Sequence, residues 1–176
     1  MAVCLEAGLV DAMGRMVAPD REQDLAPALA ARLQGEGNTR RILLASDGDA
    51  EAHAGVYFTQ KDVRELQLAK GAVRAAVELL LRECGLKVED LSAVLLAGAF
   101  GNYLRPQSAL RMGLLPPMSP TLIRGVGNAA GAGAMLALLS LPWRRRAEEI
   151  ARQAEHLELA RRPDFQQMFM ETMLFM

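Results

Sequence analysis

Two glycine-rich turns are the segments of this sequence best suited to hold a ligand. The first is Gly98-Ala99-Phe100-Gly101-Asn102, in which two glycines stand three residues apart. Because glycine has no β-carbon, such a turn lets the backbone approach a ligand closely and direct N–H groups toward it. An ordinary tight turn between a buried strand and a helix has the same composition, so both interpretations stay open on these residues alone.

The second turn lies within Gly125-Val126-Gly127-Asn128-Ala129-Ala130-Gly131-Ala132-Gly133. Asn128 can cap a helix that begins at Ala129, and the N-terminus of a helix favours a phosphate or another polar ligand group. The string also fits the dinucleotide fingerprint Gly-x-Gly-x-x-Ala. That fingerprint requires an acidic residue about 20 positions later at the end of the next strand. Residues 144–149 are instead a charged helical segment, which disfavours a Rossmann unit, and no P-loop motif is present.

A lysine falls within the apolar stripe of the longest expected helix. Lys70 follows Val63 by seven residues and precedes Val73 by three, so its ammonium needs an anionic partner or a path to solvent. The neighbouring Gly71 costs the helix about 1 kcal/mol relative to alanine. A nucleotide resting on this helix, with Gln67 and Lys70 reaching toward it, is one interpretation. The residues alone favour the other, a lysine that extends to solvent beside a glycine that permits close helix packing.

Composition narrows the classes of function. With 176 residues, 51% of them hydrophobic, the chain is long enough for one domain with a core. A net charge of −1 gives no electrostatic reason to expect a nucleic-acid or membrane partner. The two cysteines and two histidines are too scattered to form a zinc or iron–sulfur ligand set. The absence of a disulfide framework, a signal segment and a long apolar run indicates a soluble, cytoplasmic chain.

The elements that must position these residues alternate between strands and helices. Thr59 and Asp62 form a variant of the capping box at the start of the longest helix, and Gly85 ends it. Two successive units of strand, glycine turn and helix indicate an α/β sheet with ligand-facing loops at the carboxyl ends of the strands. Strands are expected at 41–45, 55–58, 93–97, 122–126 and 156–160, and further helices at 8–17, 24–33, 106–112, 129–140, 142–154 and 163–175.

Two of these elements carry expectations about burial. The strand at 93–97 is a continuous apolar run, which is typical of a strand covered on both faces. The longest helix has an amphipathic pattern, and its apolar stripe is expected to consist of Val63, Leu66, Val73, Val77, Leu80 and Cys84.

Several strings resemble the corrinoid-activator family of ferredoxin-type proteins. They are FTQKDVRELQLAKGA (58–72), LAGAFGNYL (96–104), GLLP (113–116), VGNAAGAGA (126–134), HLELA (156–160) and PDFQ (163–166). Members of this family use ATP to drive the reduction of an inactive Co(II) corrinoid protein to Co(I). Their electrons pass through an N-terminal [2Fe–2S] domain, and their large C-terminal region is an actin/Hsp70-like (ASKHA) ATPase domain. The resemblance covers residue 56 to the end of the chain.

The resemblance implies a nucleotide site divided among three segments. The first turn resembles the adenosine motif of the actin-like fold, and the second turn resembles its following connecting segment. The helix around position 70 resembles the one that flanks the adenine and ribose. The residues carried over are Gln67, Lys70, Gly98, Ala99, Phe100, Gly101, Gly127, Asn128 and Gly131.

The implied fold is α/β, one lobe of an actin-like (ribonuclease H-like) ATPase with a mixed sheet flanked by helices. We expect a single domain over 1–176, with a loop-rich part at 18–55, a nucleotide-binding core at 56–140 and C-terminal helices at 141–176. The family's first phosphate loop and catalytic carboxylates come mainly from the other lobe. Where the family has Gly-Ser-Gly-Leu, this chain reads Cys4-Leu5-Glu6-Ala7-Gly8-Leu9. ATP with Mg²⁺ is therefore expected at a partial site, without turnover by the isolated chain.

The resemblance further implies a corrinoid protein of a methyltransferase system as partner, and a [2Fe–2S] cluster in the parent protein only. A homodimer stays open. The alternative hypothesis is a non-catalytic interaction or dimerisation module derived from the same lobe. An occluded turn at 98–101, together with an exposed apolar patch elsewhere, would favour that alternative.

Overall fold

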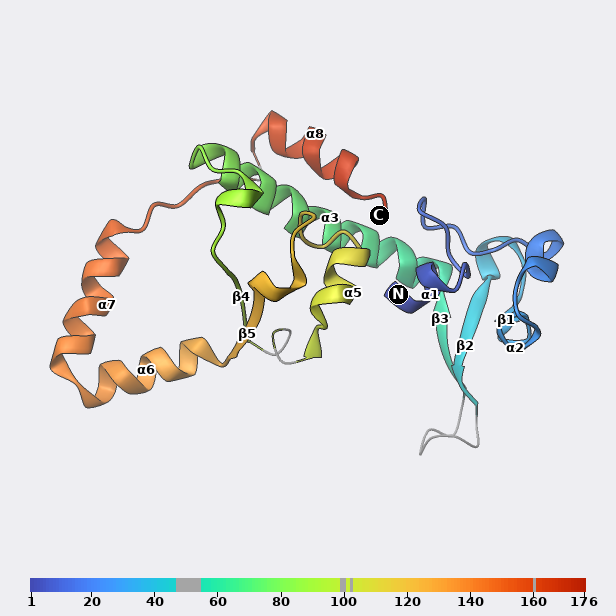
Figure 1. Cartoon of the computed structure of the whole chain (residues 1–176), viewed down its shortest axis with the longest axis horizontal. Helices are drawn as coiled ribbons and strands as arrows, with labels where there is room; N and C mark the ends of the chain where they lie inside the picture. Colours follow the sequence, from blue (N-terminus) through green and yellow to red (C-terminus); the bar gives the residue numbers. More distant parts are fainter. Residues whose placement is uncertain (47–54, 99–100, 102, 160) are drawn as a thin grey trace.

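One long helix organises the structure, a computed structural model that describes residues 1–46, 55–98, 101, 103–159 and 161–176. This helix is α3 (Gln60–Glu83), and the other elements apart from α6 and α7 are arranged around it (Figure 1). The strands are β1 (Leu33–Gln34), β2 (Arg41–Ala45), β3 (Val56–Thr59), β4 (Val94–Ala97) and β5 (Ile123–Gly127). The other α-helices are α1 (Ala2–Glu6), α2 (Pro27–Ala30), α5 (Pro106–Arg111), α6 (Ala129–Leu139), α7 (Leu141–Gln153) and α8 (Pro163–Thr172). Short 3₁₀ helices lie at Pro19–Asp24, Gly37–Thr39, Val88–Asp90 and Pro120–Leu122.

The strands confirm the α/β class but form two sheets. In the described residues, β1, β2 and β3 pair antiparallel in that order, while β4 and β5 form a separate parallel pair. The expectation of one mixed sheet is therefore wrong for the described part of the chain. The reason lies in α3, which connects β3 to β4 and, with 24 residues, is about 36 Å long. The two sheets consequently form at different places along this helix (Figure 1).

The capping box at the start of α3 is confirmed. The Thr59 backbone N–H donates to Asp62 Oδ2 at 2.8 Å, and the Asp62 N–H donates to Thr59 Oγ1 at 3.2 Å. These bonds satisfy backbone groups of the first turn, which have no partner within the helix. Two hydrogen bonds to Asp62 hold the pKa of its carboxyl below the usual value, since they favour the ionised form.

The buried face of α3 differs from the expected stripe. Val63 is buried as expected, but Val73 and Leu80 are both more than 40% exposed, and Cys84 is exposed. The cause is α8, which packs along the side of α3 that carries the small residues. The residues that this arrangement buries are Val63, Gln67, Lys70, Gly71, Ala75 and Leu79.

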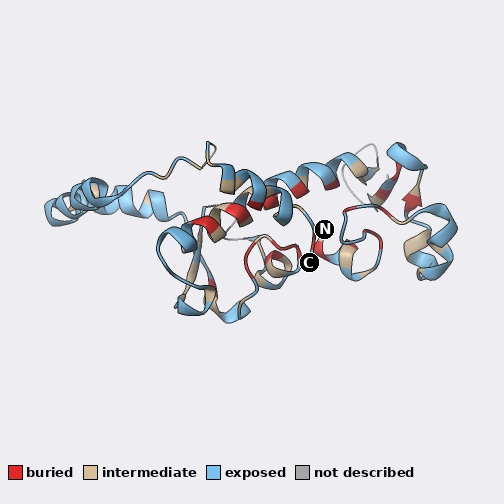
Figure 2. Ribbon diagram, turned by 90° about the horizontal axis from the view of Figure 1, so that it is seen from above, coloured by how far each residue is buried: buried red, intermediate tan, exposed pale blue. Residues whose placement is uncertain are grey.

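Among the described residues, the buried side chains form three clusters. Figure 2 shows that many of the buried residues lie on or beside α3. The largest cluster joins the N-terminal segment, β1, β2 and the start of α3, and it includes Phe175 near the end of the chain. A second lies between α3 and α8 around Leu79 and Met168. A third lies beside β4 and β5 around Ala109, Leu115 and Ile123.

Three elements expected near the ends of the chain are wrong. Residues 8–17 form no helix, because Gly8 and Gly14 adopt positive φ and the chain turns back so that Val10 and Met16 form an isolated bridge. Residues 24–33 are divided, because α2 begins at a proline and Leu33 already pairs with β2. Residues 156–159 have no strand partner and run as an extended connection between α7 and α8, and residue 160 lies outside the described residues.

Helices α6 and α7 extend away from the rest of the molecule as an arm (Figure 1). Within the described residues, α6 has no buried residue although all eleven of its residues are apolar, and Leu139 is 78% exposed. The neighbouring strand β4 has Leu95 61% exposed, so the expectation that it is covered on both faces is wrong here. Parallel strands are normally covered on both sides, which does not hold at Leu95. No helix in the described part of the chain is long and apolar enough to cross a bilayer.

Candidate functional site

The two glycine turns come together at one edge of the parallel pair. Because β4 and β5 run in the same direction, their carboxyl ends meet, and the Gly98 N–H donates to the Gly127 carbonyl oxygen at 2.7 Å. Both glycines have positive φ, 79° and 62°, a conformation that L side chains rarely adopt. The structure therefore places the two turns side by side, as an α/β sheet with ligand-facing loops requires.

Close backbone packing fixes the shape of this edge. A β-carbon at Gly101 would collide with the carbonyl oxygen of Leu96, and one at Gly125 would collide with the carbonyl oxygen of Gly101. The Gly101 N–H also donates to the Gly98 carbonyl at 3.2 Å. Only glycine fits at these positions, because the backbone at Gly101 packs directly against Leu96 and Gly125. Ala99 and Phe100, which belong to the same expected motif, lie outside the described residues.

Asn128 caps α6 as the sequence predicted. Its Oδ1 accepts from the Gly131 N–H at 2.9 Å, and a β-carbon at Gly131 would collide with the Asn128 amide group. The N-terminal end of α6 carries the positive end of the helix dipole, which favours an anionic or polar group beside it. Of the described residues of this edge, Gly98 and Asn128 are exposed and Gly101, Gly127 and Gly131 are half-buried.

Gln67 and Lys70 occupy a different place in the fold. Gln67 Nε2 donates to the carbonyl oxygens of Met13 and Met173, at 3.1 and 3.3 Å. The Lys70 ammonium donates to the carbonyl oxygen of Leu174 and lies 5.2 Å from the centre of the Phe175 ring. Both side chains thus hold the segment that follows α8, together with the loop after α1. This segment, residues 173–176, is called the C-terminal segment below.

The environment of Lys70 is unusual for a lysine. The residue is 1% exposed, so it does not extend to solvent, and the ion pairs found among the described residues give it no carboxylate partner. Burial, and to a smaller extent the positive charge of Arg74, lowers the pKa of Lys70 to about 8. The neighbouring Gly71 permits close helix packing, as one interpretation expected. A β-carbon added at Gly71 would lie 3.2 Å from Met173 Cγ, and the Thr172 hydroxyl donates to the Gly71 carbonyl oxygen.

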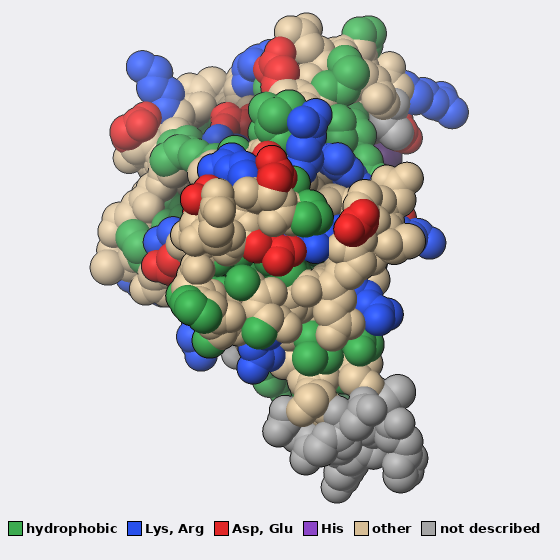
Figure 3. Space-filling view, turned by 90° about the vertical axis from the view of Figure 1, so that its right-hand side faces the viewer, with side chains coloured by type: hydrophobic (Ala, Val, Ile, Leu, Met, Phe, Trp, Pro, Cys, Tyr) green, Lys and Arg blue, Asp and Glu red, His purple; other side chains and the backbone are tan. Residues whose placement is uncertain are grey.

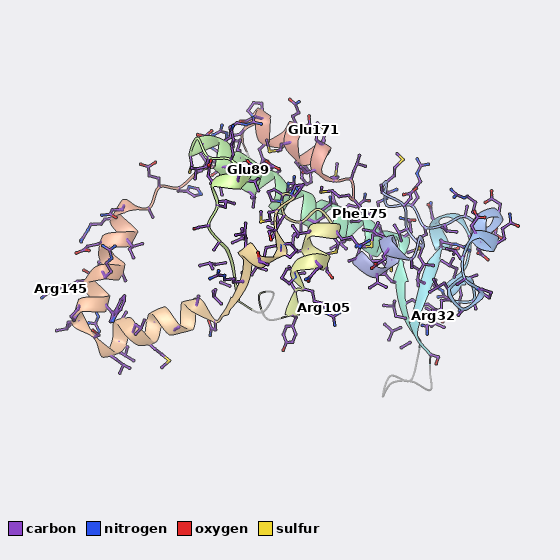
Figure 4. The ribbon with its side chains drawn as sticks, viewed as in Figure 1. Arg32, Glu89, Arg105, Arg145, Glu171 and Phe175 are labelled. Carbon is purple, nitrogen blue, oxygen red and sulfur yellow. The ribbon has the colours of Figure 1, made fainter. Side chains whose placement is uncertain are left out.

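The structure therefore divides the expected site residues into two groups. The first group is called the glycine edge and lies near the N-terminal end of α5. It consists of Gly98, Gly101, Gly127, Asn128 and Gly131. Lys70 lies beyond the other end of α5, where its Nζ is 3.3 Å from a β-carbon position at Gly113. Figure 4 shows the separation: Phe175 lies beside α3, whereas Arg105 marks the opposite end of α5 next to the turns. The printed contacts of Gln67 and Lys70 do not include the glycine edge.

The glycine edge supplies backbone N–H groups and one amide side chain but no acid. Residues 91–147, which contain β4, β5, α5 and α6, include no aspartate or glutamate. The edge thus suits the phosphate or sugar of a nucleotide, whereas carboxylate ligands for Mg²⁺ would have to come from another segment. In the part of the chain that the structure describes, no three His, Cys, Asp or Glu side chains are grouped to hold a metal ion.

Comparisons with known proteins identify the family of the chain. A family model described as the C-terminal domain of RACo, the ASKHA domain, matches residues 1–176. The corrinoid activation enzyme RamQ of Eubacterium limosum is 35% identical over 175 residues, which are 99% of this chain and 29% of RamQ. A reductase of Methanosarcina barkeri, specific for the Co(II) methylated amine-specific corrinoid protein, is 34% identical over 81% of this chain and 26% of its own length.

A solved structure shows the same fold. A reductive activator for corrinoid, iron–sulfur protein superposes with a TM-score of 0.86 at 29% identity, over 99% of this chain and 26% of that protein. This likeness confirms the actin-like α/β fold that the sequence resemblance implied. The chain spans between a quarter and a third of the length of the relatives that it matches.

Proposed function

Because the chain belongs to the family of the C-terminal ASKHA domain of RACo, we propose that it is one lobe of an ATP-dependent reductive activator of corrinoid proteins. In this proposal the complete activator transfers one electron to Co(II) and produces Co(I), and ATP drives the step. The corrinoid protein serves a methyltransferase, the [2Fe–2S] cluster belongs to another part of the activator, and the system is cytoplasmic. The observation that carries the proposal is the glycine edge at the carboxyl ends of β4 and β5.

The residues of the glycine edge would act by binding and orientation. The positive-φ glycines present backbone N–H groups without side chains, and the capped N-terminus of α6 adds its dipole. Bound Mg-ATP would supply the phosphoanhydride bond whose hydrolysis drives the reduction. Since residues 91–147 contain no carboxylate, the acids that hold Mg²⁺ and activate water come from outside them. The chain alone is then a partial nucleotide site.

Gln67 and Lys70 enter this proposal conditionally. Their polar groups bind the carbonyl oxygens of Met173 and Leu174, so they could reach an adenine or ribose only after the C-terminal segment moves away. We therefore place the nucleotide at the glycine edge, within the 56–140 part expected to form the core. In the observed structure, the side chains of Gln67 and Lys70 then have a structural role, because they hold the C-terminal segment against α3.

One observation favours the alternative, an interaction or dimerisation module. The arm of α6 and α7 exposes Leu138, Leu139, Leu141 and Trp143, each by more than half. Apolar surface of this kind marks contacts with other polypeptide. A partly exposed glycine edge and an exposed arm are both expected of a lobe that functions only beside a second lobe, so the first proposal accounts for both.

Calorimetry with Mg-ATP tests the partial site. We expect the isolated chain to bind ATP weakly or not at all and to hydrolyse none. A chimera in which this chain replaces the matching segment of RamQ should bind and hydrolyse ATP. In that chimera Asn128→Ala removes the cap of α6 and should weaken binding, while Gly133→Ala, whose β-carbon meets nothing within 4 Å, serves as the matched control. Micromolar ATP binding with hydrolysis by the chain alone would overturn the half-site proposal.

A further inference from the structure

An apolar cavity lies on the surface between three segments that are distant in sequence. It has a volume of about 370 Å³ and opens between the loop after α1, the first half of α3 and the end of the chain. Met13, Leu68, Met170 and Leu174 line it, and each of these side chains is between 46% and 61% exposed. Large apolar residues scattered singly are ordinary on a protein surface, but a group of them around one hollow marks a contact site.

Two arginines flank the same cavity. Arg64 Nη1 donates to the Met13 carbonyl at 3.2 Å and to Gln67 Oε1 at 2.8 Å, and the Arg15 side chain also lines the hollow. Neither guanidinium takes part in an ion pair among the described residues. The nearby carboxylate of Asp11 accepts from the backbone N–H of Arg15. The rim of the cavity therefore carries two guanidinium groups that form no ion pair among the described residues.

Hydrogen bonds hold the wall of the cavity in place. Gln60 binds the loop twice, through Nε2 to the Gly14 carbonyl and through Oε1 to the Met16 N–H. The Phe175 N–H donates to the Ala12 carbonyl at 2.9 Å, so the C-terminal segment fixes the same loop from the other side. The cavity is consequently formed before any partner arrives, which reduces the entropy cost of binding.

We propose that this cavity is the docking site for a protein partner that presents an apolar side chain flanked by carboxylates. Methionine adapts its shape to a partner, and both methionine and arginine are enriched in protein interfaces. Unpaired guanidinium groups bind carboxylates in a bidentate geometry. Charge complementarity therefore selects an acidic surface around an apolar residue. Under the proposed function, on which this inference rests, the partner is the corrinoid protein.

Figure 3 views the molecule from the side of β1, β2 and β3, where hydrophobic side chains gather in groups among basic and acidic ones. The docking cavity differs from the α6–α7 arm in shape, because it is a hollow lined by apolar side chains and two arginines from three segments. The arm instead exposes apolar side chains on two helices, and its Arg146 pairs with Glu149.

Binding of the chain to the corrinoid protein tests the proposal, measured by biolayer interferometry at low and high NaCl. The variant Arg15→Glu/Arg64→Glu should weaken binding by about tenfold or more and reduce the dependence on salt, because both attractive charges become repulsive. Leu68→Ser/Met170→Ser should weaken it without changing the salt dependence. The matched control is Arg145→Glu/Arg152→Glu, which makes the same change in net charge at two exposed positions of α7, and Figure 4 shows Arg145 on the arm.

The outcomes separate the docking site from the proposed function. If Arg15→Glu/Arg64→Glu binds the corrinoid protein as tightly as the wild type does, the docking site is wrong, while the corrinoid protein remains the partner. If the wild-type chain does not bind the corrinoid protein, the partner assignment and the docking site both fall. Sedimentation completes the test: wild-type self-association that the reversal abolishes would make a second copy of this chain the occupant, and would overturn the proposal of an acidic partner.

Discussion

Replacing Lys70 by methionine should change the way in which stability depends on pH. Methionine keeps a long side chain but cannot titrate. The folded state lowers the pKa of Lys70 from 10.5 to about 8, chiefly by burial. Between these two values the unfolded chain binds the proton and the folded chain does not, so the stability of the wild type rises with pH across this window. A difference of about 2.5 pH units corresponds to about 3 kcal/mol.

Urea denaturation from pH 7 to 11 measures this effect. The free energy of unfolding of the wild type relative to Lys70→Met should stay constant below about pH 8, rise by up to about 3 kcal/mol by pH 10.5, and then level off. Taking the difference between the two proteins removes the titration of every group that they share. Lys61→Met, at an exposed position in the first turn of α3, is the control and should show no such rise. A difference that stays flat from pH 7 to 11 would refute the burial of a charged Lys70.

Three further substitutions test the elements around the two groups of site residues by urea denaturation. Phe175→Ala should cost about 3–5 kcal/mol, because the ring is 4% exposed within the largest core cluster, whereas the exposed Met176→Ala should cost little. Thr59→Ala removes the cap of α3 and should lower the free energy of unfolding by about 1 kcal/mol. This loss of stability should become smaller as the pH falls. The reason is that the pKa of Asp62 is lowered in the folded state, so the stabilisation from its ionised carboxyl disappears when acid protonates it. Gly101→Ala should destabilise the chain strongly because of its collision with the Leu96 carbonyl, and a stability equal to that of wild type would contradict the packing of the glycine edge.

The features that the sequence predicted well depend on neighbouring residues. The capping box needs only Thr59 and Asp62, which are three positions apart, and the cap of α6 needs only Asn128 and Gly131. The glycine turns were predictable for the same reason, since the backbone conformation at each glycine restricts the residue type directly. These parts of the candidate site could be located before any tertiary contact was known.

The surroundings of Gln67 and Lys70 could not be predicted in this way. The carbonyl oxygens that they bind belong to Met173 and Leu174, more than one hundred positions later in the chain. The apolar stripe of α3 was misplaced for a related reason. Gly71 and Ala75 are weak signals of burial, yet α8 packs against them because they are small. A single lysine among apolar residues marked an unusual position correctly without showing which segment would cover it.

The arm and the glycine edge are joined by one helix, and this connection leads to the last prediction. Asn128 holds the N-terminal turn of α6 at the glycine edge, while Leu138 and Leu139 lie exposed about 16 Å away at its other end. An isolated helix of 11 residues is marginal in water, so a second lobe packed on the arm would also fix the direction of α6 and of its first N–H groups.

Leu138→Asp/Leu139→Asp in the RamQ chimera should therefore weaken ATP binding, although neither residue is near the turn. Ala132→Ser, on the exposed first turns of the same helix, is the control and should leave the affinity within about twofold, since a single exposed polar replacement in a helix costs only a few tenths of a kcal/mol. The affinity is measured by calorimetry, and the thermal melting of each variant separates a local effect from global unfolding. Unchanged ATP affinity in a folded Leu138→Asp/Leu139→Asp chimera would show that α6 holds its direction without cover, and would uncouple the arm from the nucleotide edge.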